Sequence, residues 1–272
     1  MLAPVERRSQ SGHHPRPLAR RSDRVKSCGR FDSQDALRHH DEVTLDAIPD
    51  FTTPVARDRL REVRLVREPL RLFLKAPAMS RQRRGNGRPV VVIPGLGTND
   101  ASTFVVRGYL SRLGYECSGW GLGVNNGEVE QQLEQTLTSL NARFDGQPIA
   151  LVAWSLGGVI ARECARDAPA IVEQVITFGT PLYGPRHTST TMARRSPRRD
   201  EIEAQIIERS TRPIERPVTA IYSRNDGVVA WEACVDPDPN TVNVEVTSSH
   251  FGLGLDPDVL NVVAETLGDP TP

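Results

Sequence analysis

The chain's strongest candidate for chemistry is a serine framed by very small residues. Ser155 follows the apolar run 149–154 and precedes residues 156–161, whose apolar positions have helical spacing. This pattern predicts a sharp turn from a strand into a helix with the hydroxyl at its apex, because Ala153 and Gly157 are small enough for the two elements to approach each other. A hydroxyl held there is a candidate nucleophile, and the alternative is an ordinary serine that caps the helix.

A carboxylate and an imidazole follow the serine in the sequence, each after a predicted strand. Asp226 comes after residues 217–223, which places it at the carboxyl end of that strand, and His250 comes after residues 242–246. An imidazole beside the serine would take the hydroxyl proton during attack and return it to the leaving group. The carboxylate would hold the imidazole in the required tautomer and stabilise its protonated form.

Among the six histidines, one is the expected base. Four of them lie in an arginine-rich leader: His13, His14, His39 and His40. His187 falls in a segment that is predicted to form a flap, and only His250 follows a terminal strand. We therefore expect His250 to be the base.

The expected acid is Asp226, although its Asp-Gly dipeptide is also a general turn signal. Asp236 and Asp238 are nearby rivals, but they lie in a Pro-rich loop well past the end of the strand. Asp256 and Asp258 are expected to cap the last helix instead.

The order of Ser155, Asp226 and His250 along the chain resembles that of the α/β-hydrolase superfamily, and more narrowly that of its small bacterial lipase and esterase members. The elbow reads Ala-x-Ser-x-Gly here, where the usual pattern is Gly-x-Ser-x-Gly. The resemblance covers about residues 88–268. It implies a minimal α/β-hydrolase fold, with a mostly parallel six-stranded sheet and helices on both of its faces.

The same resemblance assigns an oxyanion hole, in which two backbone N–H groups bind the negative oxygen of the reaction intermediate. One donor is the residue after the nucleophile, Leu156, and the other is Leu96 in the segment Pro94-Gly95-Leu96-Gly97. Many relatives have His-Gly where this chain has Pro94-Gly95, so the hydrogen bonds that support this loop must differ.

From residue 88 onward, predicted strands and helices alternate, which favours a parallel sheet covered by helices. The expected strands cover residues 89–93, 115–119, 148–153, 173–178, 217–223 and 242–246. The expected helices cover about residues 101–113, 127–144, 156–167, 200–208 and 257–267. The buried face of the second helix, behind a cap at Asn126, is predicted to consist of Val129, Leu133, Leu137 and Leu140.

Apolar side chains near the predicted site indicate an acyl pocket that suits a lipid-like ester. The expected substrate-binding side chains are Trp154, Tyr183 and Phe251, with Leu96 and Leu156 beside them. The segment 182–216 is predicted to be a lid over this pocket. Residues 121–127 either line the pocket or form a turn before a helix.

Two predicted parts precede a catalytic domain at residues 88–272. Residues 1–50 have no apolar periodicity and are expected to be a disordered basic leader, whereas residues 51–87 are expected to form a helix and a linker. The helix, from Pro54 to about Met79 with a kink at Pro69, is expected to pack on the catalytic domain through one apolar side. The members of that side are Val55, Leu60, Val63, Leu70, Phe73 and Leu74. The alternative is a weak peripheral contact of residues 54–79 with an anionic membrane.

The chain has no net charge, yet its first 88 residues carry 20 of the 34 basic and 11 of the 34 acidic side chains. No module of basic and aromatic residues accompanies this excess, so nucleic-acid binding is not expected. No export signal or membrane span is predicted, which favours the cytoplasm. The four cysteines match no metal-ligand spacing, and no motif for a metal or an organic cofactor is found.

We therefore expect a serine hydrolase that cleaves carboxylic esters through an acyl-enzyme, with a small-molecule or lipid-like ester as its substrate. An acyltransferase is one alternative, because transfer and hydrolysis differ only in whether water or another alcohol accepts the acyl group. A non-catalytic binding protein of the same fold is the other, but such proteins commonly lose a member of the triad.

Overall fold

The computed structural model describes residues 51–54, 56–79, 85–189 and 199–268. The predicted leader at 1–50 lies outside the described residues, as do parts of the predicted linker and of the predicted lid. The boundaries of the predicted domains stay predictions.

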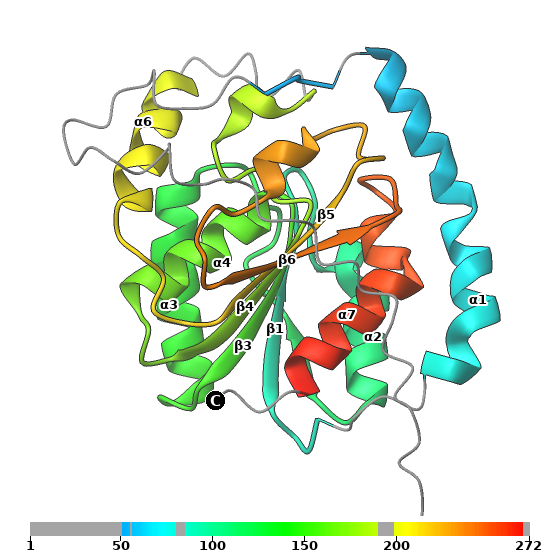
Figure 1. Cartoon of the computed structure of the whole chain (residues 1–272). Helices are drawn as coiled ribbons and strands as arrows, with labels where there is room; N and C mark the ends of the chain where they lie inside the picture. Colours follow the sequence, from blue (N-terminus) through cyan, green and yellow to red (C-terminus); the bar gives the residue numbers. More distant parts are fainter. Residues whose placement is uncertain (1–50, 55, 80–84, 190–198, 269–272) are drawn as a thin grey trace, which may run out of the picture.

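The central sheet has six strands in the order β2-β1-β3-β4-β5-β6, and every pairing between neighbours is parallel. The strands are β1 (Pro89–Ile93), β2 (Glu116–Gly119), β3 (Ile149–Trp154), β4 (Val172–Phe178), β5 (Val218–Ser223) and β6 (Thr241–Val246). Figure 1 shows the strands fanning through the centre of the molecule. The prediction of a mostly parallel six-stranded sheet is confirmed, and the observed strands begin and end within one residue of the predicted bounds.

Each connection between parallel strands must cross back over the sheet. The connection from β5 to β6 contains only the short 3-10 turn η6 (Trp231–Cys234), and the other strands are followed by α-helices. They are α2 (Phe104–Arg112), α3 (Val129–Phe144), α4 (Leu156–Asp167), α6 (Arg199–Ser210) and α7 (Pro257–Gly268), with a short 3-10 turn, η4 (Asp100–Thr103), before α2. Each was predicted at this place in the chain. None of the helices in the described part of the chain combines the length and the apolar character needed to span a membrane.

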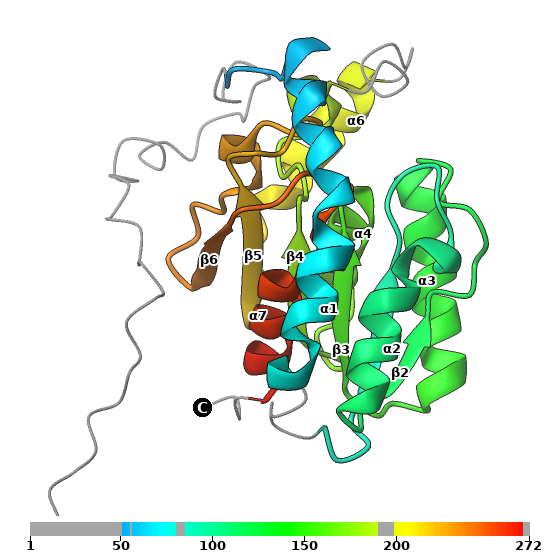
Figure 2. The same ribbon diagram turned by 90° about the vertical axis from the view of Figure 1, so that its right-hand side faces the viewer.

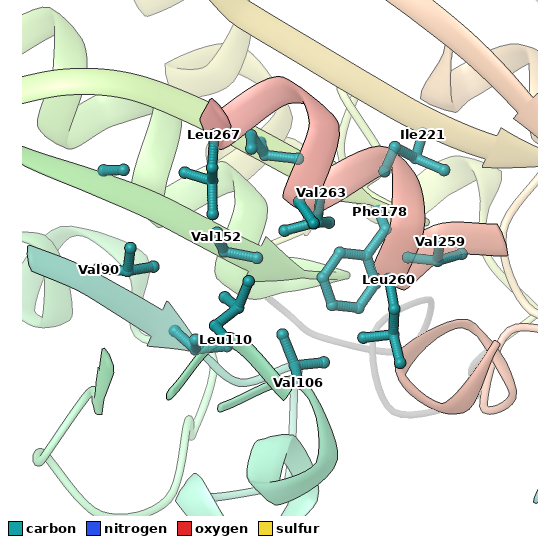
Figure 3. Packing of buried hydrophobic residues seen from close by; sticks show 14 of the residues in the cluster. Val90, Val106, Leu110, Val152, Phe178, Ile221, Val259, Leu260, Val263 and Leu267 are labelled. Carbon is teal, nitrogen blue, oxygen red and sulfur yellow. The ribbon is translucent and has the colours of Figure 1, made fainter. Parts of the chain in front are cut away.

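Alternate residues of β1 enter two separate cores, one on each face of the sheet. Val90 and Val92 belong to the core under α2 and α7, whereas Val91 and Ile93 belong to the core under α3 and α4. Successive side chains of a strand point to opposite faces, so a strand that is covered on both sides is apolar throughout. The first core is shown in Figure 3, with labelled side chains of the sheet and of both helices: Val90, Val152, Phe178, Val106, Leu110, Val259 and Leu260. The prediction of helices on both faces is confirmed.

The start of α3 differs from the prediction, although its buried face does not. That face packs on the second core through Val129, Leu133, Leu137 and Leu140. The cap position is held by Glu128 rather than Asn126. The side-chain oxygen of Asn126 accepts a 3.0 Å hydrogen bond from the Glu128 amide, and Gly127 between them has a φ of 90°. Asn126 therefore shapes the turn before the helix instead of capping the helix itself.

The segment ahead of the sheet forms two helices rather than one bent helix. The first, η3 (Ala56–Val66), is a 3-10 helix, and the second, α1 (Glu68–Met79), is an α-helix. The break falls at Arg67, before the predicted kink at Pro69. Pro69 lies in the first turn of α1, where proline is tolerated because the N–H that it lacks would have no partner within the helix.

The apolar side of this segment faces outward, so the prediction that the segment packs on the catalytic domain through this side is wrong. We call this side the outer stripe; its members are Leu60, Val63, Val66, Leu70, Phe73 and Leu74, and each is between 61% and 78% exposed. Val55 lies outside the described residues. The physical reason is that the segment docks through its other side, where Glu62 and Arg71 make polar contacts and Leu72 and Met79 pack against the first core.

Helix α1 lies beside α7, as Figures 1 and 2 show, and polar contacts hold it there. The guanidinium of Arg71 donates hydrogen bonds to Glu68 and Asp256, both at 2.8 Å, and to Asp258 at 2.6 Å. Lys75 adds a 2.5 Å bond to Asp258. Asp256 also accepts the N–H of Asp258 at 2.8 Å, as its predicted capping role requires. The side chain of Asp258, which was also expected to cap α7, pairs with α1 instead.

The described part of the predicted lid is anchored to the body by charge. Arg209 of α6 forms ion pairs with Glu163 and Asp167 of α4, both at 2.5 Å. That residues 182–216 act as a lid stays a prediction.

Candidate active site

Ser155 lies at a strained turn between β3 and α4. Its backbone has φ 53° and ψ −126°, a conformation that is uncommon for any residue except glycine. Its N–H donates a 2.9 Å hydrogen bond to the carbonyl oxygen of Phe178, and the hydroxyl of Thr180 donates a 3.0 Å bond to its carbonyl oxygen. The end of β4 and the residues after it therefore hold the turn from one side.

Small residues are required around this turn, as the sequence pattern predicts. A Cβ atom on Gly157 would lie 2.5 Å from the carbonyl oxygen of Pro94 and 2.7 Å from that of Ile93. These are backbone atoms of the neighbouring strand and loop, so they cannot move aside cheaply. Ser155 makes no side-chain capping bond to α4, which removes the alternative that it is an ordinary helix cap.

The structure brings the three predicted triad residues together at the carboxyl edge of the sheet. The Nε2 atom of His250 lies 3.1 Å from Oγ of Ser155, and its Nδ1 atom lies 2.7 Å from Oδ2 of Asp226. Ser155 follows β3, Asp226 follows β5 and His250 follows β6. Parallel strands end at one edge, which is how residues distant in sequence converge there. The arrangement can support nucleophilic attack assisted by a base.

The second oxygen of Asp226 fixes the carboxylate in place. Its Oδ1 atom accepts hydrogen bonds from the N–H groups of Val228 at 2.8 Å and Val229 at 2.7 Å. Hydrogen bonds to an ionised group are stronger than neutral ones, so the carboxylate plane is held firmly. Oδ2 is thereby directed to the imidazole of His250.

The rival residues lie elsewhere. Asp236 forms a 2.7 Å ion pair with Arg162, and it also accepts the N–H of Asp238 at 3.0 Å. His187 is buried against the ring of Phe51, with 5.1 Å between the ring centroids. None of these contacts involves Ser155.

A serine pair that was not predicted from the sequence joins the loop of Asp226 to the loop of His250. The hydroxyl of Ser223, at the end of β5, donates a 2.6 Å hydrogen bond to the carbonyl oxygen of Ser248. The Oγ atom of Ser223 in turn accepts hydrogen bonds from the N–H groups of Ser248 and Asn225, both at 3.1 Å. This buried clasp fixes the distance between the two loops.

The imidazole of His250 is a stronger base than an ordinary histidine. Its burial lowers the pKa, but the negative charge and hydrogen bond of Asp226, together with the charge of Glu62, raise the pKa above its usual value. The rings of Trp154 and Phe251 cover it, at centroid distances of 5.5 and 5.6 Å. A raised pKa favours transfer of a proton to the imidazole.

The two predicted oxyanion donors lie in backbone segments beside Ser155. Leu156 is the first residue of α4, where an N–H has no partner within the helix. Gly95 directly precedes Leu96, and a Cβ atom on it would lie 3.2 Å from Cβ of Ser155. The role of these two amides stays a prediction.

Asn125, which was not predicted as a site residue from the sequence, provides the support that the Pro94-Gly95 loop needs. Its side-chain nitrogen donates a 2.9 Å hydrogen bond to the carbonyl oxygen of Pro94. Its backbone accepts the N–H of Gly97 at 2.7 Å and donates to Thr98 at 2.8 Å. The segment 121–127 is therefore more than a turn. The sequence did hold one sign of this role, because Asn125 is a polar residue in a glycine-rich segment that follows a predicted strand.

Two of the three predicted substrate-binding aromatic residues lie at the triad. Phe251 is half-exposed, whereas Trp154 is almost fully buried against His250. Tyr183 contacts the ring of Phe51 at a centroid distance of 5.4 Å and belongs to a separate cluster. The structure therefore does not bring Tyr183 together with the other two.

A hollow lies between the start of α3 and α6, next to the predicted oxyanion loop. It is lined by residues 127–131 and by Ile202 and Gln205. A Cβ atom on Gly127 would lie 3.0 Å from the side chain of Leu96, which places the hollow close to this loop. Its lining mixes polar and apolar side chains.

The cysteines of the described region are not suited to act as nucleophiles. Burial raises the pKa of Cys117 to about 12, and it raises the pKa of Cys164 and Cys234 further above the usual value. The reactive thiolate is therefore scarce at neutral pH. In the described ranges, no group of three or more histidine, cysteine or acidic side chains is arranged to hold a metal ion.

Neither protein-family models nor curated proteins match the sequence, but solved structures resemble the fold. A Bacillus licheniformis lipase in its mature form is 15% identical with a TM-score of 0.52, covering 69% of this chain and 94% of that one. A Paleococcus ferrophilus monoacylglycerol lipase is 15% identical with a TM-score of 0.51, and the match covers 67% of this chain and 96% of that one. Est1E from Butyrivibrio proteoclasticus is 16% identical with a TM-score of 0.50, and the match covers 67% of this chain and 86% of that one. Together with the order of the strands, this likeness identifies the fold of the chain as the α/β-hydrolase fold.

Proposed function

We propose that the protein is a serine hydrolase that cleaves carboxylic esters through an acyl-enzyme. The observation that carries this proposal is the chain of contacts from Ser155 Oγ to His250 Nε2, at 3.1 Å, and from His250 Nδ1 to Asp226 Oδ2, at 2.7 Å. The strained backbone of Ser155 supports it, because such strain persists where the surroundings enforce it and is concentrated at functional sites.

In the acylation step, Oγ of Ser155 bonds to the carbonyl carbon of the ester while its proton passes to Nε2 of His250. Asp226 stabilises the imidazolium that forms. The amides of Leu96 and Leu156 are the proposed donors to the oxygen that becomes negative. His250 then gives the proton to the alcohol oxygen as the carbon–oxygen bond breaks, and the acyl group stays on Ser155.

Water completes the hydrolytic cycle. It loses a proton to His250 as it attacks the acyl carbon, and the bond to Ser155 breaks as Oγ takes that proton back. The products are a carboxylic acid and the free enzyme. An alcohol in place of water would make the same steps an acyl transfer, so the choice of acceptor has to be measured.

The side chains around the nucleophile favour an apolar acyl group. Phe251 is half-exposed beside the imidazole, and Leu96 and Leu156 flank the proposed oxyanion site. Apolar walls with a few placed polar groups are typical of sites for apolar ligands. The lipase and the monoacylglycerol lipase that share the fold agree with this substrate class.

Hydrolysis of p-nitrophenyl esters of graded acyl length tests the proposal. We expect p-nitrophenol release by the purified protein and its near-complete loss in His250→Ala. In Asp226→Asn we expect a loss on the order of 10⁴ because the imidazole is left in the wrong tautomer. Adding a competing alcohol separates the alternatives, since a new ester as the main product would identify an acyltransferase. Binding of the esters without any turnover would identify a binding protein.

A further inference from the structure

The N-terminal helix η3 directs one carboxylate into the loops that carry the acid and the base. The Oε1 atom of Glu62 accepts hydrogen bonds from the N–H groups of Gly227 and His250, both at 3.0 Å. Its Oε2 atom accepts the N–H of Phe251, also at 3.0 Å. Gly227 directly follows Asp226 in the loop after β5, whereas His250 and Phe251 lie in the loop after β6. One side chain therefore bridges both catalytic loops.

These three contacts hold the backbone from which the imidazole projects. Hydrogen bonds from N–H groups to an ionised carboxylate are among the stronger ones in proteins. The side chain of His250 contacts Ser155 and Asp226, while its backbone N–H contacts Glu62. The direction of the imidazole therefore depends on Glu62 as well as on the triad itself.

The close approach of η3 to the loop after β5 is independent evidence that these two segments pack tightly together. A Cβ atom on Gly227 would lie 2.5 Å from the carbonyl oxygen of Asp58 and 3.0 Å from Oε1 of Glu62. The first of these is a backbone atom, so any larger residue would push η3 away from the loop. Gly227 thus permits the contact that Glu62 makes.

We infer that Glu62 is a positioning residue, which clamps the two catalytic loops together and so orients His250 toward Ser155. The inference rests on the proposed function for its kinetic consequence. Glu62 contacts backbone amides of the loops rather than reacting atoms, so its role is to act through His250 and not to take part in the bond changes.

The charge of Glu62 gives this clamp a measurable signature. Within the described residues, two carboxylates face His250: Asp226 from the loop after β5 and Glu62 from η3. The other neighbours of the imidazole, Ser155 and the two rings that cover it, carry no charge. Burial lowers the pKa of His250, and both carboxylates raise it. Removing the charge of Glu62 should therefore lower the imidazole pKa.

Three substitutions test the clamp. Glu62→Ala removes all three bonds, Glu62→Gln keeps one oxygen acceptor but removes the charge, and Gly227→Ala pushes η3 away without changing Glu62. Asp58→Asn is the matched control, because it removes one negative charge from the same helix at a side chain that pairs with Arg61. For each folded variant, kcat and KM are measured with a p-nitrophenyl ester, and the His250 pKa is measured by NMR titration.

We expect Glu62→Ala and Gly227→Ala to lower kcat by about 10- to 100-fold with little change in KM, because a misplacement of ~1 Å can cost ~10²-fold. Glu62→Gln should lose less activity, yet its imidazole pKa should be lower than that of the wild type. Asp58→Asn should match the wild type in both measurements. The NMR titration needs no substrate, so it tests the clamp even if the protein hydrolyses no ester.

The clamp is overturned if Glu62→Gln and Glu62→Ala, both folded, keep the wild-type His250 pKa and the wild-type kcat. It is also overturned if Asp58→Asn changes both quantities as much as Glu62→Gln does, because the effect would then be a general one of charge on η3. If the clamp fails in the first of these ways, a wild-type protein that hydrolyses the ester and reacts at Ser155 with a serine-directed fluorophosphonate would leave the proposed function intact.

Discussion

The carboxamide of Asn125 donates a 2.9 Å hydrogen bond to the carbonyl oxygen of Pro94 and thereby ties the loop after β2 to the loop after β1. Asn125 is completely buried, and its backbone adds bonds to Gly97 and Thr98 in the same loop. Leu96 lies between these bonded residues. The amide proposed as an oxyanion donor is thus held in place by a residue that lies well downstream in the sequence.

Asn125→Ala should therefore lower kcat for ester hydrolysis by about 10- to 100-fold while KM changes little. Direct removal of an oxyanion donor costs ~10²–10³ in kcat, and loosening its support should cost somewhat less. Steady-state kinetics checks this, with Asn126→Ala as the control, since that neighbouring asparagine is exposed and supports only the turn before α3. Equal kinetics of the two variants would contradict the role of Asn125.

Activity should rise with pH through a midpoint above ~6.5, the ordinary pKa of histidine, because the base must be neutral and the carboxylates of Asp226 and Glu62 raise the His250 pKa. The raised pKa of His250 also stabilises the native state. This stabilisation is complete at pH values below the pKa that the histidine has in the unfolded chain. That contribution is lost as the pH rises through the higher native pKa. The pH dependence of kcat/KM measures the midpoint. A profile that is flat between about pH 5 and 8, with chemistry limiting, would rule out His250 as the base.

Arg71→Met should destabilise the protein by about 1–3 kcal/mol, because it leaves the buried carboxylates of Glu68 and Asp256 without their shared partner. Phe73→Ser should change the stability by less than about 0.5 kcal/mol, because Phe73 is exposed. Urea denaturation of both variants measures which substitution lowers the free energy of unfolding more. The reverse order would mean that the outer stripe packs on the protein after all.

Weak binding to vesicles that contain anionic lipid is the role we propose for the outer stripe. An exposed apolar patch of this kind is typical of interaction surfaces, and Arg67 is exposed beside it. Vesicle sedimentation should show binding that weakens with salt and is lost in the double variant Phe73→Ser, Leu74→Ser. Equal sedimentation of this variant and the wild type would exclude the stripe as the contact.

The sheet and the triad could be predicted because their chemistry restricts the sequence. A strand covered on both faces must be apolar throughout, as β1 is, and the turn at Ser155 admits only a glycine at position 157. The order of Ser155, Asp226 and His250 then follows from three strand ends that share one edge. These features leave patterns within a few neighbouring residues.

The docking of the N-terminal segment could not be predicted in the same way. Apolar periodicity identifies which side chains share a face of a helix, but not whether that face meets protein or solvent. Here the ionic contacts of Arg71 and the packing of Leu72 and Met79 hold the other side of α1 against the protein. The role of Glu62 left no local pattern in the sequence either. Its partners are the backbone N–H groups of Gly227 and Phe251, which lie 165 and 189 residues further along the chain.

Labelling with a fluorophosphonate, followed by peptide mass spectrometry, tests the central claim most directly. The account predicts a single labelled residue, Ser155, and a folded Ser155→Ala protein that is neither labelled nor active, with a loss on the order of 10⁶ in kcat. The melting temperature of that variant should stay close to that of the wild type, since the change removes one oxygen atom. Label on a different residue, or near wild-type hydrolysis by folded Ser155→Ala, would contradict the account.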